Sequence, residues 1–420
     1  MLFYLDDKTY HQDDLNARWH ALQQQGLGKA KRLAVCTADT FEWLAVALYC
    51  RHHNLSVAPL QPDTPYDTAL TKALKLDCDY LLWQHGGKLE KIGNSSRPSG
   101  TLIQFSSGTT GEPKAIERSW HEIDTEIEHY NRLLNVSADI TPVIACAITH
   151  SYGFICGLLA SMARGVVPHI VSGWNPKQLL RVLESYPKPL LYSSPVFIHT
   201  LLMLQRGATP LYGVMTSGSV MPEPWFAQLR AKATHIWQQY GCSEAGCVAI
   251  AYQPQTSSTL GQALQHCKLQ AGSSAQQAQE IIIEQGDKHI HTRDAGFINA
   301  DGNLHFCGRL DDTIICGGIN VYPQEVEAAL SQHPDIDEAV VFKMPDPLAG
   351  ERVAAIYTGR ELSDVELRTF FREHLTSHQC PSWIQHQNQI PRLSNGKISR
   401  RQLTQQFARQ PQTQPCEGVA

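Results

Sequence analysis

The sequence lacks the marks of several protein classes. Its 420 residues carry 35 basic and 40 acidic side chains, a formal charge of -5, and no long run of Lys or Arg. Duplex-binding proteins usually present a basic face, so nucleic acid is not an expected partner. The first ten residues, MLFYLDDKTY, contain no basic segment followed by an apolar core. A secretory signal is therefore not expected.

Long apolar runs and paired cysteines are also missing. The nearest approach to a membrane span, residues 153–171, is interrupted by Arg164 and Pro168 and instead predicts a buried helix, a turn and a strand. The twelve cysteines are scattered from Cys36 to Cys416 with no pair at CxxC spacing. We expect reduced thiols packed as small apolar groups, with no zinc site, in a cytoplasmic protein without a membrane span.

What is present is the composition of an ordinary folded protein. Hydrophobic residues make up 42% of the chain, with 29 Gly and 23 Pro, and no repeat of 20–50 residues is visible. At roughly 150 residues per domain, this length predicts two or three domains.

Strand-length apolar runs alternate with helical segments up to about residue 252. Residues 31–38 predict a buried strand, and a helix at 40–52, capped near Asp39 or Thr40, follows it. After a Gly, Ser and Pro-rich stretch come a strand at 101–106, a Gly-rich turn and a long helix expected at 115–134. This alternation predicts an α/β fold with parallel sheets and helical crossovers.

The pattern changes twice towards the C-terminus. Short strand candidates in Gln and Ser-rich surroundings after residue 252 predict a small β-barrel-like piece. From residue 320 a separate small α+β domain is expected, with a helix at 323–332, strands at 338–343 and 353–358, and a helix at 363–375. The last twelve residues, 409–420, predict a disordered tail.

One segment carries most of the chemical information. FSSGTTGEPK, residues 105–114, lies between a predicted strand and a predicted helix. Glycines permit close backbone approach to a polyphosphate, and hydroxyls and free N–H groups bond its oxygens. It is not a Walker loop, because Gly111 is followed by Glu112, Pro113 and Lys114 in place of Lys and Ser or Thr.

The segment resembles the phosphate loop of the adenylate-forming, or AMP-binding, superfamily, of the acyl-CoA and aryl-CoA synthetase type. Four further motifs of that family follow in order: QYGCSEAG (239–246), HTRDAGF (291–297), GRLDDTIICGGINVYPQEVE (308–327) and PRLSNGKISRRQL (391–403). Arg293 stands where the family commonly has glycine. The motif positions also imply a shortened N-terminal region. Five motifs in order over about three hundred residues make a specific resemblance.

The resemblance implies an ATP-dependent acid-thiol ligase that forms an acyl-AMP and pyrophosphate, using ATP, Mg²⁺ and the thiol of CoA or of a carrier protein's phosphopantetheine. It implies an AMP-binding domain over residues 1–310 and a mobile catalytic lid over residues 311–408. The implied nucleotide-binding residues are Ser106, Ser107, Gly108, Thr109, Thr110, Gly111, Lys114, Ser217, Gly218, Tyr240, Gly241, Ser243, Asp294 and Arg309.

The family also implies roles in catalysis and in domain rotation. Lys397, Glu244 and His150 are the implied catalytic residues, with Glu244 and Thr109 at the metal, and the lysine stabilises charge at the α-phosphate and substrate carboxylate. The implied hinge is Asp311, and Gly317 and Gly318 are implied to line a thiol channel beside bare backbone.

The substrate acid stays open at this stage. HSYGF (150–154) is implied to border the carboxylate pocket, with Tyr152, Phe154 and Met215 as lining residues. The segment contains no aspartate to pair with an α-amino group, so a plain aryl or acyl acid is expected.

The acceptor and oligomeric state also stay open. Candidates for a basic patch at a CoA channel are Arg352, Lys343 and Arg392. The alternatives to a ligase acting on a plain acid are a stand-alone amino-acid adenylation enzyme, a nucleotide-binding pseudoenzyme and a luciferase-like oxygenase.

Overall fold

The computed structural model describes residues 1–84, 88–106, 114–173, 175–205, 210–316, 319–346, 350–393 and 396–408. Contacts divide the chain into two compact units. The first unit comprises residues 1–218, 233–252 and 263–268, and the second comprises residues 219–232, 253–262 and 269 onward. The domain boundary predicted at residue 310 lies within the second unit and stays a prediction. In the described part of the chain, no helix has the length and apolar character needed to cross a membrane.

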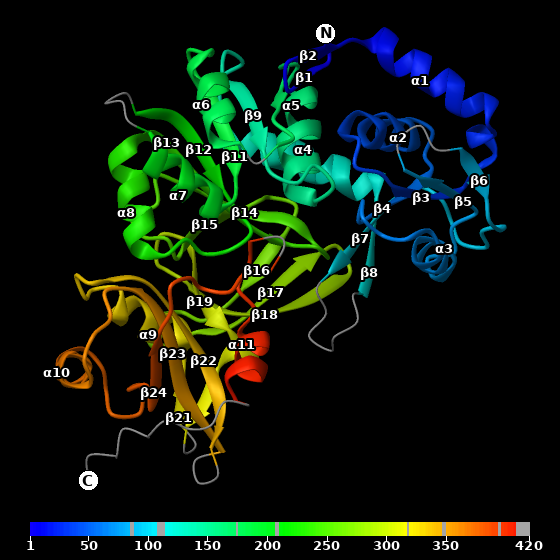
Figure 1. Ribbon diagram of the computed structural model, residues 1–420. Coiled ribbons are helices and arrows are strands. Elements are labelled where there is room, and N and C mark those ends of the chain that lie inside the picture. The colour runs from blue at the N-terminus through cyan, green and yellow to red at the C-terminus, as the bar shows by residue number, and fades with distance from the viewer. Residues whose placement is uncertain are drawn as a thin grey trace. The chain divides into compact units, whose positions relative to one another are not determined.

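A six-stranded sheet opens the first unit, with the order β6-β5-β3-β4-β7-β8. Its strands are β3 (Arg32–Cys36), β4 (Ser56–Leu60), β5 (Tyr80–Trp83), β6 (Leu89–Lys91), β7 (Thr101–Ser106) and β8 (Lys114–Ser119). The inner strands β5, β3, β4 and β7 are parallel, as predicted. The associated helices are α1 (Gln12–Gln24), η1 (Leu27–Lys29), α2 (Thr40–His52) and α3 (Tyr66–Lys75). Figure 1 shows α2 and α3 on opposite faces of this sheet.

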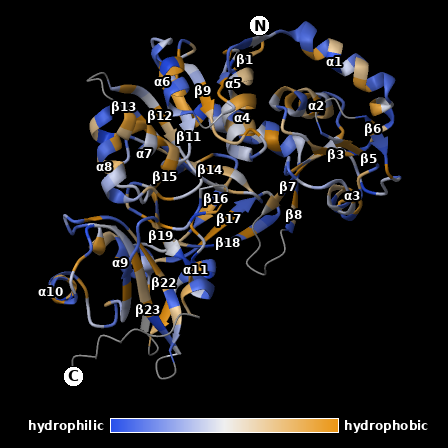
Figure 2. Cartoon of the chain, viewed as in Figure 1, coloured by the Kyte–Doolittle hydropathy of each residue, from blue (hydrophilic) through white to orange (hydrophobic). Residues whose placement is uncertain are grey.

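Helix α2 begins where the sequence predicts. The Asp39 carboxylate accepts a hydrogen bond of 3.0 Å from the N–H of Glu42, which caps the first turn. Residues 42–50 of α2 are all buried, so this is a core helix. Figure 2 shows the contrast with the largely hydrophilic α1.

The helix expected at 115–134 is wrong over its first five residues. Residues 114–119 form β8, which pairs antiparallel with β7 from Thr101↔Ser119 to Ser106↔Lys114. Helix α4 (Trp120–Leu134) starts only at Trp120. Ser119 and Glu122 form a capping box there, and this S-x-x-E pattern is the sequence signal for the true start.

The second sheet of the first unit has the order β14-β13-β12-β11-β9-β10-β1-β2. Its strands are β1 (Phe3–Leu5), β2 (Lys8–Tyr10), β9 (Thr141–Ala145), β10 (His169–Ile170), β11 (Pro189–Ser193), β12 (Leu211–Thr216), β13 (Ala233–Cys242) and β14 (Gly246–Tyr252). The accompanying helices are the π-helical η2 (Tyr152–Leu159), α5 (Ala160–Ala163), α6 (Pro176–Glu184) and α7 (Pro195–Leu204). Residues 153–171 thus form buried helix, turn and strand, as predicted.

The order of these strands creates a switch point. Strands β10, β9, β11, β12 and β13 run parallel to one another. From β9 the chain passes through η2 and α5 to β10 on one side, and then through α6 to β11 on the other. Ligands of open α/β sheets bind at the carboxyl ends of the strands where the order reverses, which here means β9 and β11.

In the second unit, the predicted barrel-like piece is an open sheet. The strands β15 (Thr259–Ala263), β16 (Lys268–Gln270), β17 (Gln279–Gln285), β18 (Lys288–Ile298) and β19 (Leu304–Arg309) take the order β16-β17-β18-β19-β15. Among the described residues β15 does not pair with β16, so the sheet is open and the prediction of a barrel-like piece is wrong in this respect. Helix α8 (Glu223–Lys232) and the turns η3 (Ala275–Gln277) and η4 (Leu310–Asp312) also belong to this unit.

The α+β arrangement expected after residue 320 is confirmed. A sheet of order β21-β20-β23-β22, with β24 beside β23, contains β20 (Ile314–Cys316), β21 (Ile319–Val321), β22 (Ile336–Asp346), β23 (Gly350–Gly359) and β24 (Trp383–His386). Its helices are α9 (Pro323–Leu330), α10 (Asp364–His374) and α11 (Arg400–Phe407). Alternate β22 residues serve two cores, since Val341 packs in one cluster and Phe342 in the other.

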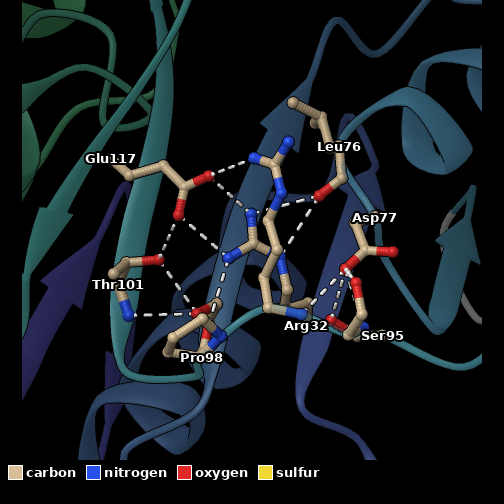
Figure 3. Close-up of polar contacts among 10 residues, drawn as sticks. Arg32, Leu76, Asp77, Ser95, Pro98, Thr101 and Glu117 are labelled. Carbon is tan, nitrogen blue, oxygen red and sulfur yellow. Dashed lines mark hydrogen bonds and ion pairs between the residues drawn. The ribbon is translucent and has the colours of Figure 1, made fainter.

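A fully buried arginine on the inner strand β3 binds the edge strand β8 of the same sheet (Figure 3). Arg32 on β3 is 0% exposed and donates to both carboxylate oxygens of Glu117 on β8, at 2.8 and 2.9 Å. It also donates to the carbonyl oxygens of Leu76 and Pro98. The hydrogen bond from Arg32, more than any other contact, lowers the pKa of Glu117 below its ordinary value. The pair therefore stabilises the fold above that pKa.

Replacing this arginine is expected to destabilise the first unit strongly. Arg32→Met leaves Glu117 without its buried partner, which typically costs about 3–5 kcal/mol of unfolding free energy. Urea unfolding at neutral pH measures this loss, and the difference from wild type should shrink as the pH falls through the lowered pKa of Glu117, because protonation removes the pair. Arg97→Ala, which removes the exposed second partner, is the control and should cost only about 1 kcal/mol or less.

Candidate active site

The switch point gathers three of the predicted motif segments. HSYGF follows β9, Ser217 and Gly218 follow β12, and the QYGCSEAG segment spans the end of β13. Strands β9, β12 and β13 run in the same direction in one sheet, so these segments lie along one edge of it. The first unit alone therefore places the segments predicted to bind the carboxylate, the adenine and the metal at the sheet edge where ligands are expected.

The phosphate loop is described only at its flanks. Ser107, Gly108, Thr109, Thr110 and Gly111 lie outside the described residues, so their roles stay predictions. Ser106 is the last residue of β7, and the exposed Lys114 is the first residue of β8. The two strands pair with one another up to Ser106↔Lys114. The loop therefore starts and ends at one edge of the first sheet.

The strand that enters this loop is bonded to the carboxylate segment. The side-chain amide of Gln104 on β7 donates a 3.1 Å hydrogen bond to the carbonyl oxygen of Thr149, and the Ser151 hydroxyl donates to its Oε1. Gln104 is buried, so both contacts are shielded from water. The predicted phosphate and carboxylate segments are thereby fixed to each other.

The glutamate of QYGCSEAG lies on a very tight turn. Gly241 and Gly246 flank it, and a Cβ added at Gly241 would lie 2.0 Å from the Gly246 carbonyl oxygen. Gly246 also has a φ of +77°, which favours glycine. Glu244 is half-buried at the turn, beside Cys242, whose pKa is raised to about 12 by burial first and then by the Glu244 charge. The turn therefore presents a carboxylate and not a reactive thiolate.

The residues of the first unit that are predicted to contact the nucleotide differ in exposure. Tyr240 on β13 is 9% exposed, whereas Gly218 is exposed, and a Cβ added there would meet no other residue within 4 Å. The half-buried Ser217 hydroxyl donates to the carbonyl oxygen of Gln239 at 3.4 Å. Ser243 is half-buried on the turn itself. Their contacts with adenine stay predictions.

The residues expected to line the acid pocket lie together, but two of them belong to the core. The Tyr152 hydroxyl donates to the Met215 carbonyl oxygen at 2.6 Å, so η2 and β12 meet here. Phe154 and Met215 are 0% exposed, and the Phe154 ring packs 5.8 Å from that of Trp43. Half-buried Tyr152 and exposed His150 are thus the accessible members, and the pocket assignment stays a prediction.

The second unit holds the other predicted charged residues. Asp294 on β18 and Arg309 on β19 are register partners, joined by a 2.7 Å hydrogen bond from the guanidinium. Asp294 is 7% exposed. Burial acts to lower the pKa of Arg309, but Asp294 outweighs it and the pKa lies above its ordinary value. Arg309 therefore stays protonated at neutral pH, and one Asp294 oxygen is already bonded to it.

Lys397 lies on a loop that is flanked by two ion-paired arginines. Arg392 pairs with Glu338 on β22 and donates to the Gly396 carbonyl oxygen at 3.2 Å. Arg400 pairs with Glu327 at 2.7 Å and Asp312 at 3.1 Å. The loop that carries the lysine is therefore fixed on both sides.

The lysine itself remains exposed, yet its titration is shifted. Desolvation of the ammonium and then the positive charge of Arg309 lower the pKa of Lys397, and Asp294 opposes them. These neighbours place the lysine near the Asp294–Arg309 pair within the second unit. A cation of this kind suits stabilisation of negative charge on an incoming phosphate.

Arg293 has the left-handed backbone that explains why the family commonly has glycine at this position. Its φ is +61°, which costs a non-glycine residue roughly 1–2 kcal/mol. Its guanidinium donates to the Asp311 carboxylate at 3.0 and 3.2 Å, and Arg309 lies 3.7 Å from the other oxygen. Asp311, the predicted hinge, is therefore bracketed by two arginines. Gly317 and Gly318, the predicted channel residues, lie outside the described part of the chain.

Two substitutions separate the strain at this position from the ion pair. Arg293→Gly should leave the unfolding free energy within about 1 kcal/mol of wild type, since relieved strain offsets an exposed ion pair. Arg293→Ala loses the same pair but keeps a Cβ, and should be less stable than the glycine variant by about 1 kcal/mol. Urea unfolding of both variants measures this difference in unfolding free energy. Equal stabilities would show that the backbone is not strained.

Sequence reasoning missed the buried polar residues behind the motifs. Gln104 interrupts the apolar run TLIQFS, and that single polar residue is the one signal the sequence offers. Arg118 and Glu126 form a buried ion pair of 2.6 Å, but no spacing rule joins a strand residue to a helix residue eight positions later. The wrong helix at 115–119 also concealed it.

Comparisons with known proteins identify the family of the chain. Residues 91–272 match the AMP-binding enzyme family and residues 325–397 its C-terminal domain. A 3,4-dihydroxybenzoate–[aryl-carrier protein] ligase of Bacillus anthracis is 35% identical over 96% of this chain and 98% of its own. A 2-succinylbenzoate–CoA ligase of Bacillus velezensis is 24% identical over 81% and 75%.

Solved structures show the same fold. ATP-bound MatB from Rhodopseudomonas palustris superposes with a TM-score of 0.84 at 17% identity, covering 97% of this chain and 96% of that one. O-succinylbenzoate CoA synthetase from Bacillus subtilis, bound to ATP and magnesium, gives 0.80 at 18% identity, with 96% of each chain covered. The chain belongs to the AMP-binding, adenylate-forming enzyme family and is an ATP-dependent acid-thiol ligase.

Proposed function

We propose that the substrate is an aryl carboxylic acid and that the acceptor is the phosphopantetheine thiol of an aryl carrier protein. The observation that carries the proposal is the 35% identity to an aryl-carrier protein ligase over 96% of this chain and 98% of that one. A carboxylate oxygen attacks the α-phosphorus of ATP, and pyrophosphate leaves. The thiol sulfur then attacks the acyl carbon, its proton is lost, and AMP leaves.

Several predicted site residues would take part in the first step, the formation of the acyl-AMP. Lys114 and the loop residues 106–111 would bond the β- and γ-phosphates, and Asp294 would accept from the ribose hydroxyls. Tyr240, Gly241, Ser217, Gly218 and Ser243 would surround the adenine side of the nucleotide. Lys397, with its lowered pKa, would donate to the α-phosphate and the carboxylate and so stabilise the transition state.

A magnesium ion fits the turn that carries Glu244. One half-buried carboxylate at a strand end, with ATP supplying further oxygens, is the donor set that Mg²⁺ accepts. When bound, the ion neutralises phosphate charge. Thr109 would be a second oxygen donor to it. Glu244 would hold the ion at the strand end where the nucleotide is expected.

The pocket residues favour an acid without an amino group. HSYGF offers His150, Ser151 and Tyr152 but no carboxylate, so a buried ammonium would have no partner there. Tyr152 supplies an aromatic wall, and exposed His150 can hydrogen-bond the carboxylate or a ring hydroxyl. An aryl acid, hydroxylated in the manner of the relative's substrate, matches these groups.

The charges in the second unit favour a carrier protein over CoA. Of the three cations considered for a CoA phosphate patch, Lys343 is paired with Glu351 at 3.2 Å and Arg392 with Glu338, while Arg352 is 9% exposed. None of the three is an exposed cation without a carboxylate partner. A carrier protein presents the same thiol arm but needs no site for the 3′-phosphate of CoA.

We further propose Asp311 as the hinge at which residues 311–408 rotate between the two steps, with Gly317 and Gly318 beside the thiol arm.

The test is ATP–pyrophosphate exchange across a panel of acids. Dihydroxybenzoates and benzoate should support exchange, whereas long aliphatic acids and amino acids should not. Thioester formation should then be faster with a holo aryl carrier protein than with CoA at equal concentration. Exchange with amino acids alone would contradict the substrate proposal, and preference for CoA would contradict the acceptor proposal.

A further inference from the structure

A buried ion pair lies directly beneath the turn that carries Glu244. Arg118 on β8 and Glu126 on α4 are joined at 2.6 Å, and their side chains are 5% and 0% exposed. The other Glu126 oxygen accepts a 2.7 Å hydrogen bond from the backbone N–H of Cys247 on β14. The pair therefore connects three elements of the first unit at one point.

The pair touches the backbone that closes the turn. A Cβ added at Gly246 would lie 2.3 Å from Glu126 Oε2 and 2.4 Å from Arg118 Nη1. Cys247, whose N–H the glutamate accepts, is the next residue. Glu244 lies two positions before Gly246. A shift of the Glu126 carboxylate would therefore move the turn, through its contact with Gly246 and its hydrogen bond with the Cys247 N–H.

Stability alone is a weak reason for such a pair. Removing two charges from water costs free energy that their attraction often only repays, and apolar residues of similar size are frequently as stable. Here the cost is increased, because Arg118 Nη1 is buried with no hydrogen-bond partner among the described residues. A buried ion pair does fix the relative positions of the elements that carry it, because each charge has one low-energy position.

The elements that the pair joins are those of the proposed nucleotide site. Strand β8 begins at Lys114, the last residue of the phosphate-loop motif, and Arg118 is four residues further along. The neighbouring residue Glu117 is held on the first sheet by Arg32 (Figure 3). Adjacent residues of β8 are thus bound in two different directions, one into the first sheet and one towards the Glu244 turn.

We propose that Arg118 and Glu126 are positioning residues that fix the Glu244 turn relative to the strand leaving the phosphate loop. The proposal rests on the proposed function of Glu244 at the metal. Arg118 and Glu126 would act through the Cys247 N–H and the Gly246 backbone, and not by direct contact with substrate or metal. Its effect should therefore fall on Mg·ATP and not on the acid.

The decisive variant replaces both charges with apolar side chains of similar length. Arg118→Met with Glu126→Met should fold with a melting temperature close to that of wild type, because removing the desolvation cost of the ion pair offsets the loss of the acceptor for the Cys247 N–H. In ATP–pyrophosphate exchange, the Mg·ATP concentration for half-maximal rate should rise by about 10- to 100-fold, the usual effect of losing a supporting partner of a metal ligand. The KM for the acid should not change.

Two single variants complete the experiment. Glu126→Gln keeps an oxygen for the Cys247 N–H and should show a smaller rise in the Mg·ATP requirement than the double variant. Asp124→Asn, on the same helix, removes an exposed pair with Arg51 of 2.6 Å and should match wild type in every measurement.

The outcomes separate the two proposals. A folded double variant with an unchanged Mg·ATP requirement, or with equal rises for Mg·ATP and acid, would overturn the positioning role while leaving the ligase function intact. Absence of exchange by the folded wild-type protein with every acid of the panel would overturn both.

Discussion

Lys397→Ala should lower the rate of ATP–pyrophosphate exchange by roughly 100- to 1,000-fold, the effect expected when one preorganised donor to a developing anion is removed. The protein should fold normally. Lys397 is exposed, and its loop is anchored independently by the ion pairs of Arg392 and Arg400. A loss of this size without a loss of stability would identify a group that acts mainly in the transition state.

The pH profile gives a second readout of the same residue. The pKa of Lys397 is lowered by desolvation and by Arg309, and catalysis requires the protonated form, so exchange should decline as the pH rises through this lowered value. Lys397→Arg keeps its charge at any accessible pH and should extend activity to more alkaline pH, even if its maximum rate is lower. A profile of identical shape for the arginine variant would show that the alkaline limb belongs to another group.

The control for both experiments is Lys343→Ala in the same unit. Lys343 forms a partly exposed ion pair with Glu351 and has no role in the proposed adenylation step. Its exchange rate should equal that of wild type. If Lys397→Ala were also to retain full exchange, the lysine would not be the catalytic cation.

Glu244→Gln should have the other large effect, a loss of about 100-fold in exchange at fixed Mg²⁺, or roughly 2.7 kcal/mol of transition-state stabilisation. The substitution preserves the size of the side chain but replaces a charged oxygen ligand with an amide. Because the turn is shaped by Gly241 and Gly246, the backbone should not rearrange. Raising the Mg²⁺ concentration should restore part of the lost rate, which distinguishes a metal ligand from a structural residue.

A matched control for Glu244 is Glu280→Gln in the second unit. Glu280 pairs with His291 at 2.9 Å and accepts from the N–H of Arg293, well outside the metal motif in sequence. Its replacement should leave the Mg²⁺ dependence of exchange unchanged. Full activity of Glu244→Gln at low Mg²⁺ would contradict the metal assignment.

Local patterns predict the elements whose cause is local. The β3 run and the Asp39 cap of α2 are confirmed, because apolar length and a capping side chain act within a few residues. The strand β8 (KAIERS) is not predicted by its local pattern, because its pairing partner is β7. This pairing overrides the helical tendency of its charged residues.

The site could be predicted only as far as motifs extend along the chain. The sequence names Glu244, but not the Arg118–Glu126 pair beneath its turn, because that contact joins residues brought together by the sheet and α4. The open order of β15–β19 was likewise invisible, since closure depends on which strands pair and not on their individual patterns.

The contact between Gly246 and the buried pair also sets a rule for recombining this ligase with its relatives. Arg118, Glu126 and Gly246 are spread over more than a hundred residues, yet they fit only as a set. In a chimera with a crossover between α4 and β14, Arg118 and Glu126 come from one parent and Gly246 comes from the other. Exchange of acid-pocket segments should therefore succeed when residues 114–247 move as one block, and fail more often when they are divided.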